Sequence, residues 1–494
     1  MYAIAIAVLV AQTPNELSAA ARQDAQQFAA DGKFSRYHYY LVADEVTNGV
    51  LRWVLSSTSL QPEIEQCLPT PIVPGLYRIY LGTPLNEEQT KFDGGLGWRH
   101  EDWFEVLKAH PYGGYGIMVR GDWLLTDILD AALSASQHED GIPTYDRLLY
   151  RGKPPKTEAE LLKFWEIDDV KQRHRGAIEG ISQVNRRGRR WIETRDRHEG
   201  YFWITRDATA LSVGSDPLED PTGGFRHDGS EAIVGLSKVS TRSFERGSVQ
   251  YYWLGNGAGT TVYEAPVQLV EDSTRFRNVP SIRTWGSCLQ CHLEGIRPLD
   301  SNALVELHQK YGVLGASTNP ALLADIRRFH FGSLTRDIER NQEDYAAGVR
   351  MHTGWTVKEL VEAVKSVVEG YDASLTLAKA SLELGVSPEI LRERLIGYSG
   401  LSEGKFAFGA PAGLLVLVNG GTCSRDLFAQ QFSFLDGLVR QGETNATTPR
   451  TGTVPVVKGP DRTGPSDTSA DAVAEPTRRL PTGRPRVNRQ RPRR

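Results

Sequence analysis

The sequence VQYYWLGNGAGTTVYEA, at residues 249–265, places two runs of aromatic and β-branched residues on either side of a glycine-rich stretch. Runs of this composition favour β-strands. The Asn256-Gly257 pair between them is typical of a tight turn, because both residues adopt left-handed backbone angles at low cost. We therefore expect a β-hairpin with strands at Val249–Leu254 and Thr260–Ala265.

The residues before this hairpin mix both kinds of secondary structure. Short strands are predicted at Gly200–Thr205 and Ala232–Leu236, and Leu76–Leu81 alternates apolar and polar residues as a half-buried strand does. Apolar residues at helical spacing predict helices at 14–31, Trp103–Ala109, Trp123–Leu133 and Glu158–Trp165. The pattern of Tyr37–Leu60 does not decide between helix and strand.

Past residue 300 the pattern is helical almost throughout. Thr356 and Glu359 have the spacing of a capping box, so a helix is expected to begin there and to end at Gly370. Three further helices are predicted at Ser374–Leu384, Ser387–Leu395 and Asp426–Val439. The expected fold class is therefore α+β, with a mixed N-terminal half that contains the β-hairpin region and a mostly α-helical C-terminal half.

The composition is that of a soluble globular protein over most of the chain. Of 494 residues, 40% are hydrophobic and 24% are charged, which excludes a disordered, collagen-like or coiled-coil protein for the bulk. The formal charge is −4, but Arg478–Arg494 holds eight arginines and no acids, which leaves −12 on the rest. Residues 441–494 have almost no apolar side chains, and we expect them to form a disordered basic tail.

The first residues, MYAIAIAVLVA, are apolar and are followed by polar residues from Gln12. This order is typical of the core and cleavage region of a signal peptide, although a Lys or Arg before the core is missing. The alternative is a buried first strand or helical turn. A bilayer span needs roughly 20 apolar residues, and no stretch of the chain reaches that length. We therefore expect residues 1–12 to be a signal peptide and the protein to have no transmembrane span.

Residues 288–292 read CLQCH, which is the C-x-x-C-H attachment motif of c-type haem. Two thiols three positions apart on one turn can both reach the vinyl groups of one porphyrin, and the adjacent histidine can then bind the iron. The motif predicts one covalent haem c, with thioethers at Cys288 and Cys291 and with His292 as the proximal iron ligand. A zinc site would need a second ligand pair, and Cys67 and Cys423 are isolated. A thioredoxin-like pair would need a surrounding βαβ unit, which the pattern does not predict.

The sequence leaves three possibilities for the sixth iron ligand: Met351, His227 or no ligand from the protein. Met351 follows the motif, and a methionine ligand would raise the reduction potential. His227 lies on a predicted turn beside Asp228, which could fix the tautomer of its imidazole. An open sixth position is the remaining alternative.

Three segments together resemble a family of large, uncharacterised, exported bacterial c-type cytochromes. In that family a His-Asp-Gly-Gly-Glu stretch precedes a β-hairpin and then a single C-x-x-C-H motif. Here residues 227–231 read HDGSE, with Ser230 in place of a glycine, and the hairpin and Cys288–His292 with Gly295 follow. The resemblance covers most of residues 75–440 and implies haem binding and electron transfer. The family has no settled partner or substrate.

We therefore expect a c-type cytochrome that transfers single electrons outside the cytoplasm, in the periplasm or after secretion, to an unidentified redox partner protein. Residues 13–200 would form a mixed α/β region of unknown role, and residues 201–440 the cytochrome c-like haem region. An electron-transfer role is favoured over catalysis. The alternative is a haem peroxidase or a gas or redox sensor, which needs an open sixth iron position and a nearby group such as His227.

A second alternative is a DNA-binding protein. Leu377–Leu391 has the cadence of a helix-turn-helix, and the basic tail could contact phosphates. Glu389 and Glu393 make the second helix a poor surface for DNA, however, and an exported protein does not meet a genome. We expect no nucleic-acid partner, and we assign to the Arg-rich tail a role in association with anionic surfaces.

Overall fold

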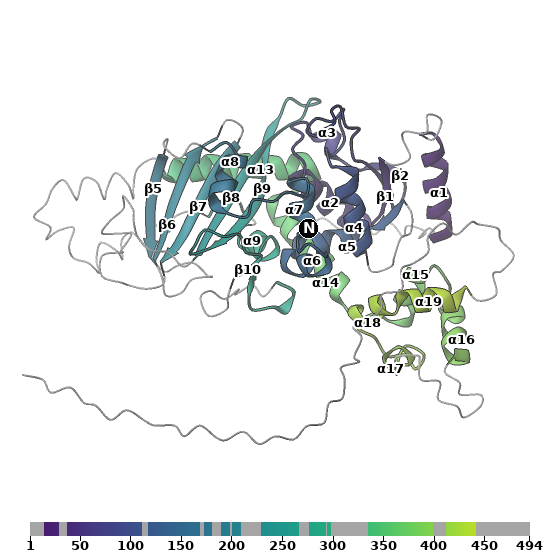
Figure 1. Ribbon diagram of the computed structural model, residues 1–494. Helices are drawn as coiled ribbons and strands as arrows, with labels where there is room; N and C mark the ends of the chain where they lie inside the picture. Colours follow the sequence, from purple (N-terminus) through teal and green to yellow (C-terminus); the bar gives the residue numbers. More distant parts are fainter. Residues whose placement is uncertain are drawn as a thin grey trace, which may run out of the picture. The chain divides into compact units, whose positions relative to one another are not determined.

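The computed structural model (Figure 1) describes eleven stretches of the chain. They are residues 14–28, 37–110, 117–167, 172–179, 189–197, 200–208, 229–265, 276–292, 294–297, 334–398 and 412–440. The predicted signal peptide at 1–12, the predicted ligand His227 and the predicted disordered tail at 441–494 lie outside these residues. None of the described helices is long and apolar enough to cross a membrane.

A four-stranded sheet organises the N-terminal region, with strand order β2-β3-β1-β4. β1 (His38–Val42) is antiparallel to β3 (Leu76–Tyr80) and parallel to β4 (Met118–Arg120), and β2 (Thr70–Val73) pairs with the outer edge of β3. β3 confirms the strand predicted from alternation.

Helix α2 (Glu45–Ser57) follows β1 directly, so the undecided segment Tyr37–Leu60 is a strand and then a helix. Asp44 is the N-cap of α2, and its side chain accepts a hydrogen bond from the backbone N–H of Thr47. Such a cap satisfies one of the amide groups that the first helical turn leaves free.

The remaining N-terminal elements are short helices. They are α1 (Pro14–Gln26), α3 (Ile64–Cys67), α4 (His100–Ala109), α5 (Gly121–Leu129), α6 (Ala131–Gln137), α7 (Thr144–Leu149) and α8 (Glu158–Phe164). The prediction of one helix over Trp123–Leu133 was wrong, because Asp130 leaves the helical conformation at φ −115° and caps α6 through the N–H of Leu133. The other predicted helices of this half are confirmed.

A five-stranded antiparallel sheet follows, with its strands in chain order. They are β5 (Gln172–Glu179), β6 (Arg189–Asp196), β7 (Gly200–Ala208), β8 (Gly229–Val239) and β9 (Arg246–Asn256). β7 and β8 confirm two predicted strands, while β5 and β6 were not predicted. The boundary predicted between residues 200 and 201 therefore cuts through this sheet, because β5 and β6 precede it and β8 and β9 follow it.

The predicted hairpin forms, but its second strand is short: the N–H of Val262 donates to the Leu254 carbonyl, the N–H of Asn256 donates to the Thr260 carbonyl, and Gly255 lies opposite Thr261. The left-handed angle of its turn is at Gly259, not at the Asn256-Gly257 pair as predicted. Asn256 Oδ1 accepts hydrogen bonds from the backbone N–H groups of Ala258 and Thr260, both at 3.0 Å, and these bonds close the turn. The main partner of β9 is β8, with Val239 opposite Arg246 and Gly229 opposite Asn256. The last two residues of the expected second strand form β10 (Glu264–Ala265), which pairs with β11 (Ile282–Arg283).

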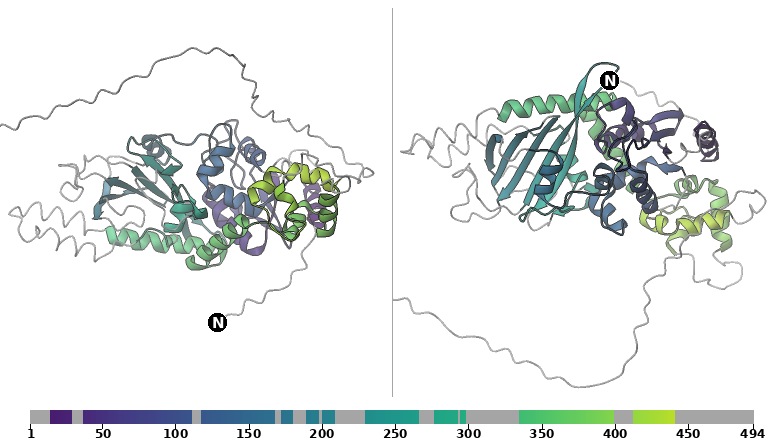
Figure 2. Two further views of the ribbon diagram at one scale, coloured as in Figure 1. Left: turned by 90° about the horizontal axis from the view of Figure 1, so that it is seen from below. Right: turned by 45° about the horizontal axis from the view of Figure 1, so that its top comes forward.

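Helix α13 (Leu334–Thr353) lies across one face of the five-stranded sheet and follows β9, as Figures 1 and 2 show. The helix and strand backbones approach closely at two glycines. A Cβ atom on Gly348 would lie 2.0 Å from the carbonyl oxygen of Ser248, and one on Gly247 would lie 2.3 Å from the amide nitrogen of Gly348. The absence of side chains here therefore sets how near α13 comes to the sheet.

The described chain after residue 334 is helical, as expected, but the single helix predicted over Asp426–Val439 is wrong, because Gln431, at φ −102° and ψ 4°, divides it into two. α14 (Val357–Asp372) has the predicted capping box between Thr356 and Glu359. It is followed by α15 (Leu377–Leu384), α16 (Pro388–Tyr398), α17 (Ala412–Leu415), α18 (Arg425–Gln430) and α19 (Phe432–Val439). Helices α15–α19 bury a core of their own, separate from the main one. The α+β class is thus correct for the described residues.

Candidate functional site

The C-x-x-C-H motif lies on one short helix, α9 (Gly286–Cys291), which begins three residues after β11. Cys288 and Cys291 are three positions apart, so their side chains project from the same side of the helix. Cys288 is buried, and Cys291 and the C-capping residue His292 are half-buried. Both cysteines are free thiols. Two thiols and an imidazole thus lie on one helical turn and directly after it.

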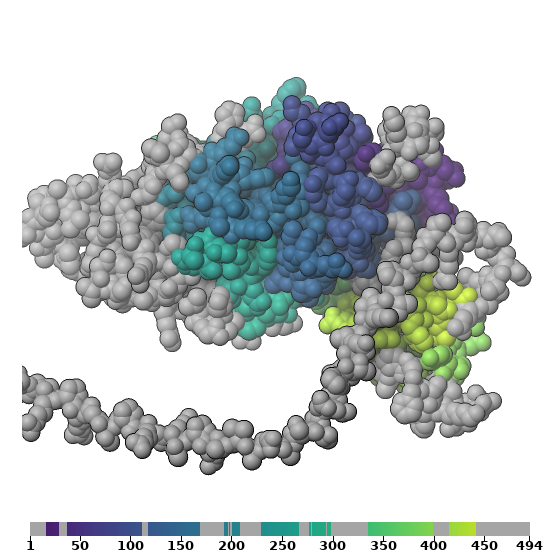
Figure 3. Space-filling view, in the orientation of Figure 1, coloured from purple at the N-terminus to yellow at the C-terminus, as the bar shows by residue number. Residues whose placement is uncertain are grey.

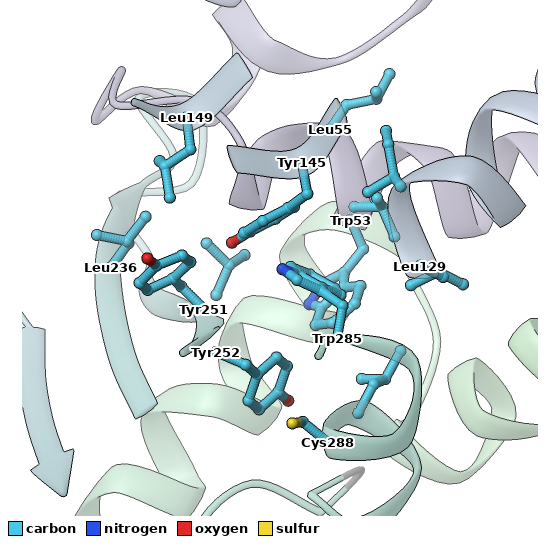
Figure 4. Close-up of a cluster of buried hydrophobic side chains, with 14 of the residues drawn as sticks. Trp53, Leu55, Leu129, Tyr145, Leu149, Leu236, Tyr251, Tyr252, Trp285 and Cys288 are labelled. Atoms are coloured by element: carbon cyan, nitrogen blue, oxygen red, sulfur yellow. The ribbon is translucent and has the colours of Figure 1, made fainter. Parts of the chain in front are cut away.

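Trp285 connects β11 to α9 in a strained conformation. Its backbone has φ 80° and ψ −76°, a region that a bulky residue rarely adopts and that costs roughly 1–3 kcal/mol. Burial of the whole side chain holds it there: the indole lies 5.3 Å from the ring of Tyr252 and 4.3 Å from that of Tyr145. Figure 4 shows Trp285 between these two tyrosines. Aromatic packing thus fixes the direction in which α9 begins.

Ion pairs also hold the segment before α9 in place. The buried carboxylate of Asp130 accepts from Arg283 at 2.6 Å and from Arg277 at 3.2 Å, and Arg277 also binds Asp372 at 2.6 Å. Asp130 lies between α5 and α6, and Asp372 ends α14. The charge of the buried Asp130 is therefore compensated by two guanidinium groups, as burial of a carboxylate requires.

The imidazole of His292 is held between a carbonyl and a carboxylate. Nδ1 lies 3.3 Å from the carbonyl oxygen of Gly295, and Nε2 lies 3.3 Å from Oε1 of Glu231 on β8. The ring of Tyr252 lies 6.2 Å away and Cys288 is close to the same ring (Figure 4). Gly295 has φ 88°, a left-handed angle that favours glycine, so the turn that brings its carbonyl to Nδ1 depends on this residue.

Cys288, Cys291 and His292 are the residue types that hold a c-type haem. A metal-binding histidine ordinarily donates its second ring N–H to a carbonyl or carboxylate, and the Gly295 carbonyl is placed to accept from Nδ1 of His292. With its proton on Nδ1, the ring would present the lone pair of Nε2, the nitrogen that here faces Glu231, to a metal. Glu231 occupies the direction along which Nε2 would meet an iron, so haem binding requires this carboxylate to move aside.

The described residues support neither a zinc site nor a thioredoxin-like pair at the two motif cysteines. Within the described part of the chain, no three His, Cys, Asp or Glu side chains converge as a metal ion would require. β11 has two residues and pairs antiparallel with β10, whereas a thioredoxin-like motif follows a strand of a parallel βαβ unit. Cys67 and Cys423 lie buried elsewhere in the fold.

Of the two residues predicted as the sixth ligand, the structure describes only Met351. It is half-buried on α13. This helix meets the segment after the motif at Gln342, which donates to the carbonyl of Ile296 at 2.7 Å. Met351 is nine residues further on, or about 13 Å along the helix axis at 1.5 Å per residue. The packing described here does not bring Met351 beside His292, and its role stays a prediction.

Sequence reasoning missed the residues around the motif, Glu231 and Tyr252 above all. Ile233 lies opposite Tyr252 in the β8–β9 pairing, and Glu231 is two residues from Ile233. Residues two apart in a strand share a face, so Glu231 lies diagonally across from Tyr252. Glu231 belongs to the HDGSE stretch that the sequence analysis noted. Its position beside His292 depends on the register between β8 and β9, which no local sequence pattern predicts.

Comparison of the chain with models of known protein families, with curated proteins and with solved structures found no match. The functional argument therefore depends on the motif and on the side chains that surround it.

Proposed function

We propose that this protein is a c-type cytochrome that binds one covalent haem through Cys288 and Cys291, with His292 as the proximal ligand. The observation that carries the proposal is the geometry of one turn: two thiols on the same side of α9, followed by an imidazole whose Nδ1 lies 3.3 Å from a carbonyl oxygen. Bound there, the haem supplies an iron that gains or loses one electron.

The chain's own residues would anchor that haem and control its surroundings. The thiols hold it covalently, and the Gly295 carbonyl orients the ligand nitrogen of His292. The buried rings of Tyr252 and Trp285 exclude water from the side of the motif that they cover. An apolar, water-poor environment is one of the levers by which a protein tunes a haem potential. These are the properties of an electron carrier.

We place this activity outside the cytoplasm, in the periplasm or after secretion. Two features of the sequence support that location: the apolar first residues, and the motif itself, because haem c is ordinarily attached after export. In a cell fractionation, we expect the full chain outside the cytoplasm. A variant without residues 1–12 should stay inside the cell. Equal distribution of both forms would contradict the proposed location.

The test is the visible spectrum of protein made in a host with c-type haem maturation machinery, recorded before and after extraction with acid acetone. We expect colour that stays with the polypeptide, because thioethers survive this extraction. The Cys288→Ser, Cys291→Ser double variant should lose the covalent haem. Cys423→Ser, a matched thiol outside the motif, should keep it. A colourless wild-type protein would remove the basis of the proposal.

The spin state of the haem separates electron transfer from its alternative. A low-spin reduced spectrum means that both axial positions are filled, as in an electron carrier. A high-spin spectrum that shifts with carbon monoxide would instead indicate the haem peroxidase or the gas or redox sensor. If the spectrum is low-spin, His227→Gln and Met351→Leu test the two predicted sixth ligands, and only loss of the true ligand should open the iron to carbon monoxide.

A further inference from the structure

The hairpin formed by β8 and β9 extends beyond the rest of its sheet. Gly200, at the end of β7, lies opposite Leu236, so β8 runs three residues past its pairing with β7. The two strands continue as a ribbon to the pair of Val239 and Arg246. Figures 1 and 3 show the teal end of this ribbon at the top of the view. Residues 240–245, which we call the hairpin tip, therefore project from the sheet.

Contacts with the chain around α3 hold the hairpin tip in place. The buried ammonium group of Lys238 donates to the carbonyl oxygen of Ser59 at 2.8 Å. Ser240 Oγ donates to Oε1 of Glu65 on α3, also at 2.8 Å. The backbone N–H of Ser240 donates to the carbonyl of Glu245 at 3.0 Å and closes the loop. The base of the tip is thus fixed to the body of the protein.

Phe244 lies on this tip in an unfavourable conformation. Its φ is 56°, in the left-handed region where a bulky side chain is strained. Its side chain is 89% exposed, the largest fraction of any large hydrophobic residue in the described part of the chain. Trp285, the other aromatic residue with a positive φ there, is by contrast fully buried. A glycine or an asparagine would fit position 244 with less strain, so neither conformation nor packing within the chain accounts for a phenylalanine.

Two arginines flank this exposed ring. Arg242 and Arg246 are both exposed, one on each side of Phe244 in the sequence. The carboxylate of Glu65 is bound inside the tip, and Glu245 is the one acid of residues 240–245. Guanidinium groups bind phosphate oxygens through paired hydrogen bonds. At the surface of an anionic bilayer, phosphates lie directly above apolar chains, so a ring between two arginines matches both layers.

We infer that the hairpin tip inserts Phe244 into the interface of a bilayer that contains anionic lipid, with Arg242 and Arg246 on the headgroup phosphates. Contact with lipid explains why a strained, exposed ring lies at the end of a fixed ribbon. A single apolar group binds a bilayer only weakly, and stable attachment takes a second attraction. The Arg-rich tail can provide that attraction, and the tip then decides which end of the sheet faces the bilayer.

This orientation places the C-x-x-C-H motif on the aqueous side. Glu231, which contacts His292, is eight residues before Val239 on β8. A strand rises about 3.3 Å per residue, so these eight residues span about 26 Å. With the tip in the bilayer, the motif therefore lies well away from the lipid, where a soluble partner can reach it. The contact of the tip with lipid does not itself depend on haem.

The test is binding of the full chain to vesicles that contain anionic lipid, measured by co-sedimentation. Phe244→Ser should lower the partition coefficient about ten-fold, because the ring no longer leaves water. Arg242→Gln combined with Arg246→Gln should weaken binding several-fold at low salt and less at high salt. Leu85→Ser, at a position that is 65% exposed in another loop, is the matched control and should bind as the wild type does. Equal binding by Phe244→Ser and the wild type would overturn the inference.

Insertion is read directly from tryptophan fluorescence. Phe244→Trp places an indole on the tip, and Leu85→Trp places one at the control position. Both are made as full chains without haem maturation machinery, because haem absorbs this emission. On anionic vesicles the added emission from position 244 should shift to shorter wavelength and be quenched by brominated lipid, whereas that from position 85 should not change. Vesicle binding without a shift at position 244, or no binding by the full chain, would contradict insertion.

A stability measurement separates lipid contact from a structural role of Phe244. Phe244→Asn should keep or raise the free energy of unfolding in urea, because asparagine tolerates left-handed angles better, and should weaken vesicle binding. A loss of stability in this variant would show that Phe244 serves the fold, which would contradict the inference. Failure of the proposed function is distinguishable, because it is read from the covalent haem spectrum and none of these measurements needs haem.

Discussion

Two buried carboxyl groups on the N-terminal helices are neutral at mildly acidic pH. Burial raises the pKa of Asp127 on α5 to about 6 and that of Asp146 on α7 to about 7. Asp130, between α5 and α6, differs because two arginines compensate its charge. Burial of a carboxyl group is therefore compensated in two ways here. Asp127 and Asp146 keep a proton, whereas Asp130 binds two arginines.

The raised pKa values predict how stability depends on pH. Folded Asp146 keeps its proton up to about pH 7, whereas the unfolded group loses it near pH 4, so between these values stability falls as pH rises. The slope for one such group is about 1.4 kcal/mol per pH unit. Asp146→Asn, which stays neutral and keeps the shape, should flatten the slope between pH 4 and 7.

Urea unfolding at four pH values would measure this slope. Glu369→Gln, at an exposed position on α14, is the matched control and should follow the wild-type protein. Parallel curves for Asp146→Asn and the wild type would show that Asp146 is ionised in the folded protein.

At the scale of elements, helix α13 packs closely against the five-stranded sheet. Its close approach to β9 at Gly348 leaves no room for a side chain. The same helix contacts Trp53 on α2 through Tyr345, at 6.2 Å, and holds the segment after the motif through Gln342. One helix therefore links the sheet, the N-terminal region and the C-x-x-C-H motif.

Gly348→Ala should destabilise the protein by about 1–3 kcal/mol, because the added methyl group meets the Ser248 backbone and α13 must shift. Gly370→Ala is a matched control on α14, where a Cβ atom would meet nothing within 4 Å. That change should stabilise the protein by up to about 1 kcal/mol through helix propensity. The free energy of unfolding in urea measures both. Equal signs for the two variants would refute this role of Gly348.

At the scale of the molecule, charge is distributed unevenly along the chain. Eight arginines in the last seventeen residues oppose −12 on the remainder. Basic residues near an anionic membrane contribute about 1 kcal/mol each. We therefore propose that the Arg-rich tail attaches the protein to such surfaces.

Removal of residues 442–494 should abolish binding to vesicles that contain anionic lipid and leave the haem spectrum unchanged. Co-sedimentation at low and high salt measures the binding, and salt should weaken it because the attraction is electrostatic. Vesicles of neutral lipid are the control. Undiminished binding by the truncated protein would exclude the tail as the attachment site.

Local patterns determined a large part of the fold. Thr356 and Glu359 specify the beginning of α14 by themselves, because a capping box involves only residues within one turn. The C-x-x-C-H motif likewise needs one turn to place its thiols and imidazole. β6 is an exception: five of the eight residues in its sequence RRWIETRD are charged, without a strand-like alternation, and pairing with β5 and β7 makes it a strand.

Only the tertiary structure decided what surrounds the motif. Glu231 reaches His292 because of the β8–β9 register, and Trp285 keeps its strained backbone because rings from α7 and β9 enclose it. Sequence alone also missed the longer pairing of β9 with β8, and predicted only its short hairpin pairing with residues 260–262. The physical reason is the same in each case: local propensity acts over a few residues, whereas register, strain and burial depend on contacts between distant segments.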